Sequence, residues 1–272
     1  MHIQYVKADP SGNETIFVLN PVAPALHSTV AAKLLQPDCV GAEQVAYLTL
    51  TDGKPIRVDM MGGEFCGNAS RSAAAYALML SGRKEGEYSV SCSGCSTLLQ
   101  AQASLRPEGG YNAYIEMPMP ESIEAVILDV GGWPSRFYRV ALPGIVHFVH
   151  MAGDIHAIDT NVFWQSVYDY AKDEELEAFG LILFSPQTLS MIPAVYVAAT
   201  QSLYWEKSCG SGSAAVAAAL ACMGKKDVSC QVRQPGGVLS IAATVKEGVL
   251  QSLYIGGPVT FTKQREIDIP GV

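Results

Sequence analysis

The run Cys66-Gly67-Asn68-Ala69-Ser70 opens an alanine-rich apolar stretch, and Cys209-Gly210-Ser211-Gly212-Ser213 opens a second one 143 positions later. In both places a glycine-bearing turn leads into residues that favour a helix. Alanine is the best helix former and has little bulk, so strands can pack closely around a helix that is rich in it. The two runs therefore predict two central helices, each wrapped by mixed sheet.

Further matches at the same spacing indicate an internal duplication. The period is far longer than that of a solenoid repeat, so we expect two pseudo-symmetric α/β lobes. Without any gap, Ser70, Gly94 and Tyr5 fall on Ser213, Gly237 and Phe148.

Two proline-bearing breaks set the expected domain boundaries. Prolines end a strand within Met117-Pro118-Met119-Pro120, and Gly256-Gly257-Pro258 marks the second break. We therefore predict an N-terminal lobe over residues 1–118 and a C-terminal lobe over 119–258. The tail 259–272 contains a further strand-like run, and we expect it to pack on the N-terminal lobe.

Short strand-like runs separated by Gly, Pro and Asp dominate the rest of the chain. The helices predicted from apolar periodicity are Ala25–Leu35, Asn68–Leu80, Phe163–Phe179 and Ser211–Met223. The predicted strands are Ile16–Leu19, Val45–Leu50, Ile56–Met60, Tyr88–Cys92, Tyr111–Met117, Phe137–Leu142, Leu181–Phe184, Ala194–Ala199, Val228–Val232 and Leu250–Ile255.

Composition excludes several classes of function. Of the 272 residues, 49% are hydrophobic and 16% charged, which is typical of a well-buried globular protein. The net charge of −8 argues against binding to nucleic acid or to an anionic membrane. The apolar stretches are too short for a membrane span, and the N-terminus lacks a signal-peptide pattern. Seven cysteines without a disulfide pattern indicate the reducing cytoplasm.

Two matched thiols suggest chemistry that acts on one atom from both sides. Inverting an amino-acid α-carbon requires one group to remove a proton from one face and another to deliver a proton to the opposite face. A helix N-terminus stabilises a thiolate and can also hold a carboxylate. We therefore predict a racemase that needs no cofactor and no metal, since neither a pair of histidines at metal-ligand spacing nor a glycine-rich phosphate loop is present.

The chain resembles the diaminopimelate epimerase-like superfamily of cofactor-independent racemases. Within it, the chain resembles the histidine racemases of staphylopine-type metallophore biosynthesis. The segments that carry the resemblance are Pro10-Ser11-Gly12-Asn13, Glu43-Gln44, Gly63-Glu64-Phe65-Cys66-Gly67-Asn68-Ala69, Ser93-Gly94-Cys95-Ser96, His147, Gln201-Ser202-Leu203, Trp205-Glu206, Ser208-Cys209-Gly210-Ser211-Gly212 and Gln234-Pro235-Gly236-Gly237.

The resemblance implies a role for ten residues around an active site between the lobes. Cys66 and Cys209 would be the acid/base pair that interconverts L- and D-histidine. The other implied roles are binding of the substrate α-carboxylate by Gly67, Asn68, Gly210 and Ser211, contact with the substrate by Asn13 and Gln44, and adjustment of the thiol pKa values by His147 and Glu206.

Two departures from the superfamily pattern bear on the substrate. Ile145 stands where diaminopimelate epimerases carry an Asn, and Glu206-Lys207-Ser208 stands in place of their Glu-Arg pair and glycine-rich stretch. Those family residues hold the distal charged end of diaminopimelate, so their loss argues against a substrate with a second charged centre.

Alternative functions stay open from the sequence. The chain could act on another amino acid, of the diaminopimelate or proline type. A thiol-redox protein and a non-catalytic amino-acid-binding module are two further classes. The sequence leaves the oligomeric state open, with a homodimer as one option.

Overall fold

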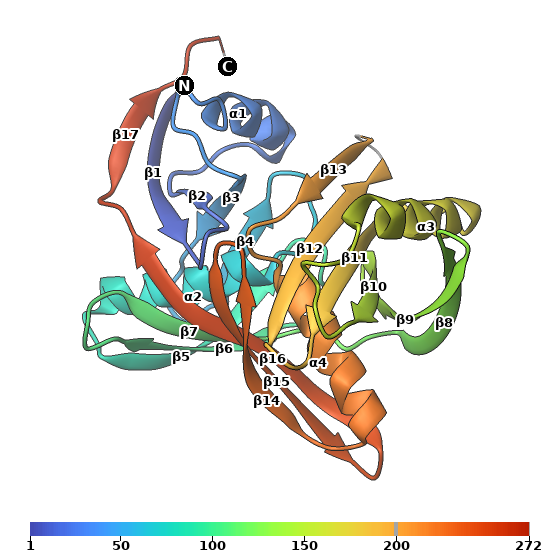
Figure 1. The fold of residues 1–272 in the computed structure, drawn as a ribbon. Coiled ribbons are helices and arrows are strands. Elements are labelled where there is room, and N and C mark those ends of the chain that lie inside the picture. Colours follow the sequence, from blue (N-terminus) through green and yellow to red (C-terminus); the bar gives the residue numbers. More distant parts are fainter. Residues whose placement is uncertain (199–200, 272) are drawn as a thin grey trace. The chain divides into compact units, whose positions relative to one another are not determined.

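The computed structural model describes residues 1–198 and 201–271, and the chain divides into two compact units (Figure 1). One unit consists of Met1–Glu116 with Gly256–Val272, and the other of Met117–Ile255. Both are mixed α/β and dominated by sheet, which confirms the predicted fold class. Ala199, the end of a predicted strand, and Val272, the end of the predicted tail, lie outside the described residues.

Eight strands of the first unit form a closed ring. Each strand pairs with the next, and β16 closes the ring by pairing with both β7 and β1. Because closure pairs every strand on both sides, the ring has no free edge. Its members are β1 (His2–Asp9), β2 (Thr15–Val18), β3 (Gln44–Thr49), β4 (Ile56–Met60), β5 (Glu85–Cys92), β6 (Leu99–Leu105), β7 (Tyr111–Glu116) and β16 (Val249–Phe261), the last entering from the other unit.

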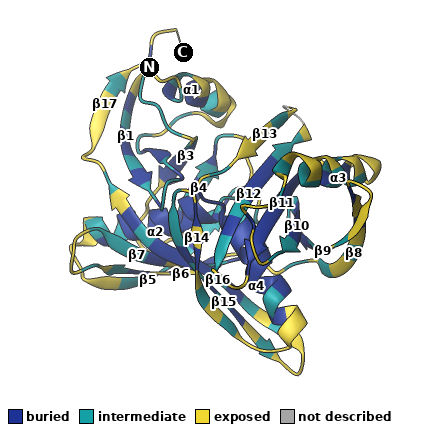
Figure 2. Ribbon diagram, in the orientation of Figure 1, coloured by how far each residue is buried: buried dark blue, intermediate teal, exposed yellow. Residues whose placement is uncertain are grey.

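Helix α2 (Gly67–Ser81) packs against β1, β4, β5, β6 and β7 of this ring. Eleven of its fifteen residues are buried, and Figure 2 shows it as a predominantly buried helix. A smaller core lies under η1 (Pro24–Leu26) and α1 (His27–Leu34), where Val30 and Leu34 pack against β1, β2 and β3.

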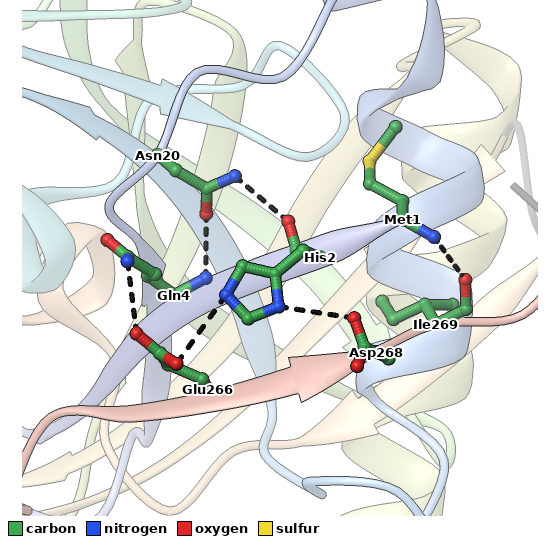
Figure 3. A network of polar contacts seen from close by, with 7 residues as sticks. All are labelled: Met1, His2, Gln4, Asn20, Glu266, Asp268 and Ile269. Atoms are coloured by element: carbon green, nitrogen blue, oxygen red, sulfur yellow. Dashed lines mark hydrogen bonds and ion pairs between the residues drawn. The ribbon is translucent and has the colours of Figure 1, made fainter.

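The last strand, β17 (Arg265–Asp268), pairs antiparallel with β1 and brings the two ends of the chain together. Figure 3 shows the polar contacts that fix this pairing. His2 contacts Asp268 (Nδ1 to Oδ1, 3.1 Å) and Glu266 (Nε2 to Oε2, 3.6 Å), and Gln4 Nε2 donates to Glu266. The N-terminal ammonium of Met1 donates to the carbonyl of Ile269 at 2.6 Å.

The second unit is a sheet with both parallel and antiparallel pairs. The parallel pair β10 with β11 is connected by helix α3 (Thr160–Asp173), while β8–β9–β10 and β11–β12–β13 are antiparallel. Strand β14 pairs with β12 at Ser190 and Arg233 and forms a hairpin with β15. The strands are β8 (Ser122–Val130), β9 (Trp133–Leu142), β10 (Ile145–Met151), β11 (Ala178–Ser185), β12 (Ser190–Val197), β13 (Ser202–Trp205), β14 (Val228–Gln234), β15 (Gly237–Lys246) and the first part of β16.

Helix α4 (Gly210–Gly224) packs against β9, β10, β11, β14 and β15, and its alanines are buried. Its bounds equal those of α2 shifted by 143 residues, the offset at which the two cysteine runs match. Among the described residues, no helix combines the length and apolar character that crossing a bilayer requires.

The predicted helix Phe163–Phe179 is wrong at both ends. Helix α3 spans Thr160–Asp173, because Asp159 caps its first turn by accepting from two main-chain N–H groups. It stops where Glu175 takes a left-handed conformation (φ 55°), and Phe179 already belongs to the buried strand β11. Strands β6, β8, β13, β15 and β17 were missed. In β6 buried and exposed residues alternate regularly, but two of its buried positions are the alanines Ala101 and Ala103, which give a weak strand signal.

Candidate active site

In the first unit, Cys66 is the N-cap of α2. Its backbone is extended (φ −134°, ψ 108°), and its Sγ accepts from the main-chain N–H of Ala69 at 3.4 Å. The side-chain amide of Gln44 also donates to this sulfur at 3.4 Å. Both donors favour negative charge on the sulfur, and the N-terminal end of the helix acts in the same direction.

A cluster of amide side chains surrounds this thiol. Gln44 Nε2 lies 2.7 Å from Asn13 Oδ1 and 2.9 Å from Thr15 Oγ1, and Asn68 Nδ2 donates to the same Asn13 oxygen at 3.4 Å. Asn13 in turn donates to Glu43 Oε2 at 3.0 Å. The structure therefore places three of the expected substrate-contacting residues in one hydrogen-bonded group with Cys66.

Arg71 extends this group into the interior and was missed from the sequence. It is completely buried, and its Nε donates to Asn68 Oδ1 at 3.1 Å. Its other nitrogens donate to the carbonyls of Pro10, Gly257 and Pro258 at 3.0 to 3.2 Å. The sequence does contain a signal that could have identified Arg71, because it is the single charged residue of α2.

The turn after β5 holds the loop that leads into Cys66. Ser93 Oγ accepts from the Met60 N–H and donates to the Glu64 carbonyl, both at 2.8 Å. Gly94 has a left-handed φ of 68°, and a Cβ there would overlap the main chain of Glu64 and of the residue after it. Glycine is therefore required at this position for the two segments to approach.

In the second unit, Cys209 is the N-cap of α4 in the same conformation (φ −110°, ψ 110°). Its Sγ accepts from the Gly212 N–H at 3.3 Å and lies 3.5 Å from Ser211 Oγ. Its own N–H donates to Gln234 Oε1 at 2.7 Å, and Gln234 Nε2 donates to Ser213 Oγ at 2.8 Å. Gln234 is a positioning group that the sequence marked only as part of a shared segment.

His147 lies on β10 and reaches Cys209 through Ser211. Its Nε2 is 2.8 Å from Ser211 Oγ, and burial lowers the pKa of the imidazole to about 3, so the ring is neutral. Nδ1 has no hydrogen-bond partner within the described residues and faces the Cα of Gly180. Ser211 has one hydroxyl proton, so it can donate to the sulfur only when Nε2 carries the proton.

Both thiols keep their protons at neutral pH in this structure. Burial is the main reason that the pKa of Cys66 rises to about 12, with smaller contributions from Cys92 and Glu64. Burial, followed by the adjacent Glu206 carboxylate, raises the pKa of Cys209 well above its ordinary value. Hydrogen bonds donated to the sulfurs, from Ala69 and Gln44 to Cys66 and from Ser211 and Gly212 to Cys209, lower these pKa values. Each thiol therefore has a proton to deliver. A thiol can accept a proton only after it has ionised to the thiolate, which requires nearby charges or hydrogen bonds that stabilise the negative sulfur.

The expected residues thus form two groups, one around each cysteine: Cys66 with Asn13, Gln44, Gly67 and Asn68, and Cys209 with His147, Glu206, Gly210 and Ser211. Over residues 1–198 and 201–271, no group of three or more His, Cys, Asp and Glu side chains is arranged to hold a metal ion. A thiol at the N-terminus of a buried helix, surrounded by amide and hydroxyl donors, is suited to proton transfer next to a carboxylate.

The fold is shared with solved structures of epimerases and isomerases. A PhzF-family phenazine biosynthesis protein of Bacillus anthracis has a TM-score of 0.67 at 15% identity and covers 99% of both chains. A hydroxyproline epimerase of Agrobacterium vitis, solved with bound trans-4-hydroxy-L-proline, has a TM-score of 0.66 at 13% identity, covering 99% of this chain and 94% of that one. At these identities the likeness concerns the fold alone.

Sequence comparison gives the family. The model described as "Histidine racemase CntK N-terminal domain" matches residues 2–266, so the chain belongs to this family. A histidine racemase of Fusobacterium nucleatum is 30% identical over 98% of this chain and 97% of its own length. One of Staphylococcus aureus is 27% identical over 95% of this chain and 94% of its own. The resemblance seen in the cysteine motifs is thereby confirmed.

Proposed function

We propose that this protein interconverts L- and D-histidine, with Cys66 and Cys209 acting on opposite faces of the substrate α-carbon. The observation that carries the proposal is the pair of fifteen-residue helices, each capped at its N-terminus by a cysteine whose sulfur accepts a main-chain N–H. The family match across residues 2–266 supports histidine as the substrate.

Each turnover moves one proton on and one proton off the α-carbon. One sulfur, as thiolate, removes the α-proton, and the other, as thiol, delivers its proton from the opposite side, so the two thiols exchange protonation states. The first amides of α2 and α4, at Gly67-Asn68 and Gly210-Ser211, hold the substrate carboxylate. They stabilise the enolate-like charge that develops on it, which lowers the barrier without a cofactor.

The residues around each cysteine have distinct roles in this proposal. Asn13 and Gln44 contact the substrate and orient the Cys66 sulfur. His147 keeps Ser211 available as a donor to Cys209, while the Glu206 carboxylate keeps the Cys209 proton in place until it is delivered. The seven cysteines are all free thiols, which is consistent with a reducing cytoplasm as the working compartment.

The test of the mechanism is hydrogen exchange at the substrate. L-Histidine incubated with the enzyme in D₂O should lose its Cα–H signal in the NMR spectrum while D-histidine appears on a chiral column. Cys66→Ala and Cys209→Ala should each retain less than a few per cent of racemisation, because each face needs its own proton carrier. Cys222→Ala, an exposed cysteine near the end of α4, is the matched control and should retain full activity.

Other outcomes of this experiment separate the alternatives. A cysteine variant that racemises at the wild-type rate would refute the two-base mechanism. Binding of amino acids without deuterium incorporation into any of them would indicate a binding module, and electron transfer without exchange a thiol-redox protein.

Substrate choice has its own test. Ile145, two residues before His147 on β10, cannot pair with a distal charged centre. Burying a second carboxylate without a partner costs several kcal/mol, which corresponds to discrimination of about a thousandfold or more. We expect kcat/KM for L-histidine to exceed that for diaminopimelate by this factor, with L-proline measured alongside. Equal values for diaminopimelate and histidine would contradict this interpretation of Ile145.

A further inference from the structure

Arg71 is a buried cation that forms no salt bridge among the described residues, although the Asp9 carboxylate and Tyr114 interact with it electrostatically. Its side chain is completely buried, and its hydrogen bonds go to one side-chain amide and three main-chain carbonyls, none of which carries a charge. Among the residues that the structure describes, no carboxylate lies within ion-pair distance of it. A buried charge left in this state is expensive, so its position calls for a reason beyond packing.

The second half of the chain has no equivalent cation. At the offset of 143 that superimposes the cysteine motifs, Arg71 falls on Ala214, a buried residue of α4. The charged group beside Cys209 is instead the Glu206 carboxylate, whose counterpart at the same offset is Gly63. The duplicated scaffold therefore differs in charge, because a buried cation follows the first cysteine motif and an alanine stands at the equivalent position after the second.

Arg71 and Cys66 are joined by a short chain of contacts. Arg71 donates to Asn68, Asn68 donates to Asn13, and Gln44 bonds both Asn13 and the Cys66 sulfur. The two residues also interact electrostatically, since negative charge on Cys66 favours the protonated guanidinium. Burial lowers the pKa of Arg71 to about 9, so the charge persists at neutral pH.

We propose that Arg71 is a positioning residue that fixes the Asn68 amide and supplies the countercharge for a Cys66 thiolate, so that Cys66 ionises before Cys209. The inference builds on the proposed racemisation by naming the thiol that first acts as the base. The other ionisable groups acting on Cys66 are Glu64, in the preceding loop, and Cys92, on β5, and both disfavour the thiolate. Arg71 is assigned the opposing role because its buried guanidinium belongs to the same hydrogen-bonded group as Cys66.

The experiment measures thiol reactivity rather than turnover. Iodoacetamide alkylation of Cys66 and Cys209 is followed at pH 8 by peptide mass spectrometry in the wild type, Arg71→Met, Arg71→Gln and Arg71→Lys. Since the thiolate is the nucleophile, removing a nearby opposite charge should slow alkylation of Cys66 by about tenfold, equivalent to about one pKa unit. Cys209, in the other unit, should react at an unchanged rate.

The lysine variant separates charge from hydrogen bonding. Arg71→Lys keeps the cation but cannot make all four hydrogen bonds, so Cys66 should alkylate within about threefold of wild type while racemisation falls because Asn68 is no longer held. Cys92 is buried and should stay unreactive in every folded variant. If Arg71→Met exposes Cys92, Arg71→Gln, which retains a donor for Asn68, takes its place.

Two results would overturn the proposed role of Arg71. Alkylation of Cys66 at the wild-type rate in the neutral variants overturns the proposal, as does slowing of Cys209 to the same extent as Cys66. Because alkylation requires no turnover, a wild-type protein that fails to racemise histidine would refute the proposed function while leaving the assignment of Arg71 to be judged on its own data.

Discussion

Gly180→Ala should disturb the surroundings of Cys209 by displacing the His147 side chain. Gly180 lies on β11 directly opposite His147 of β10 in the parallel register. A Cβ built on it would lie 2.5 Å from His147 Nδ1 and 2.7 Å from the Ala194 carbonyl oxygen. Real Cβ atoms essentially never come closer than 3.0 Å to such groups, and the carbonyl belongs to the neighbouring strand β12, so the imidazole has to move.

The expected magnitude follows from overpacking. An extra methyl in a closed core costs about 1–3 kcal/mol, and the entropic gain of replacing glycine by alanine returns about 0.4–1 kcal/mol. We therefore expect a net loss of about 1–2 kcal/mol in the free energy of unfolding, or a Tm lower by about 2–8 °C. Losing the bond from His147 to Ser211 should reduce kcat/KM by about 5- to 10-fold, the equivalent of one ordinary hydrogen bond.

The assays are thermal denaturation followed by circular dichroism and racemisation followed on a chiral column. Gly153→Ala is the matched control, because a Cβ there would approach only the Gln187 side chain, no closer than 3.4 Å. Its stability should stay within about 0.5 kcal/mol of wild type. If Gly180→Ala were as stable and as active as Gly153→Ala, the contact between the β11 backbone and His147 would not matter for the site.

Two further predictions concern the same unit. Because the pKa of His147 is lowered to about 3 in the folded protein but is about 6.5 when unfolded, the unfolded state binds more protons between these values, so stability should fall as pH drops. Between pH 7 and pH 5 this amounts to about 2 kcal/mol, and denaturant titrations should show a smaller loss over this range in His147→Gln. Gln234→Ala leaves the Cys209 N–H without its acceptor and should reduce the free energy of unfolding by about 1–3 kcal/mol, together with kcat. The exposed Gln251→Ala is its control, and equal losses in the two variants would contradict the role given to Gln234.

Local sequence signals were sufficient to predict the two helices that carry the cysteines. The two cysteine runs placed α2 and α4 to within one residue at all four ends, because alanine propensity and the turn before each run are local signals. The offset of 143 between them also held for the bounds of both helices. The family resemblance came from contiguous motifs, which need no tertiary information. Strands β6, β8 and β15 escaped detection, because pairing with neighbouring strands stabilises them more than their own residues do.

Which side chains stabilise each sulfur depends on how the chain packs. Arg71 looked like an isolated charge in a helix, and its role depends on carbonyls of Pro10, Gly257 and Pro258, up to 187 residues away. Gln234 reaches Cys209 across 25 residues, and Gly180 matters because β11 lies beside β10. Burial sets the thiol pKa values, and burial is a property of the packed chain. Interactions between residues distant in sequence depend on how the strands pair, and no local pattern encodes that.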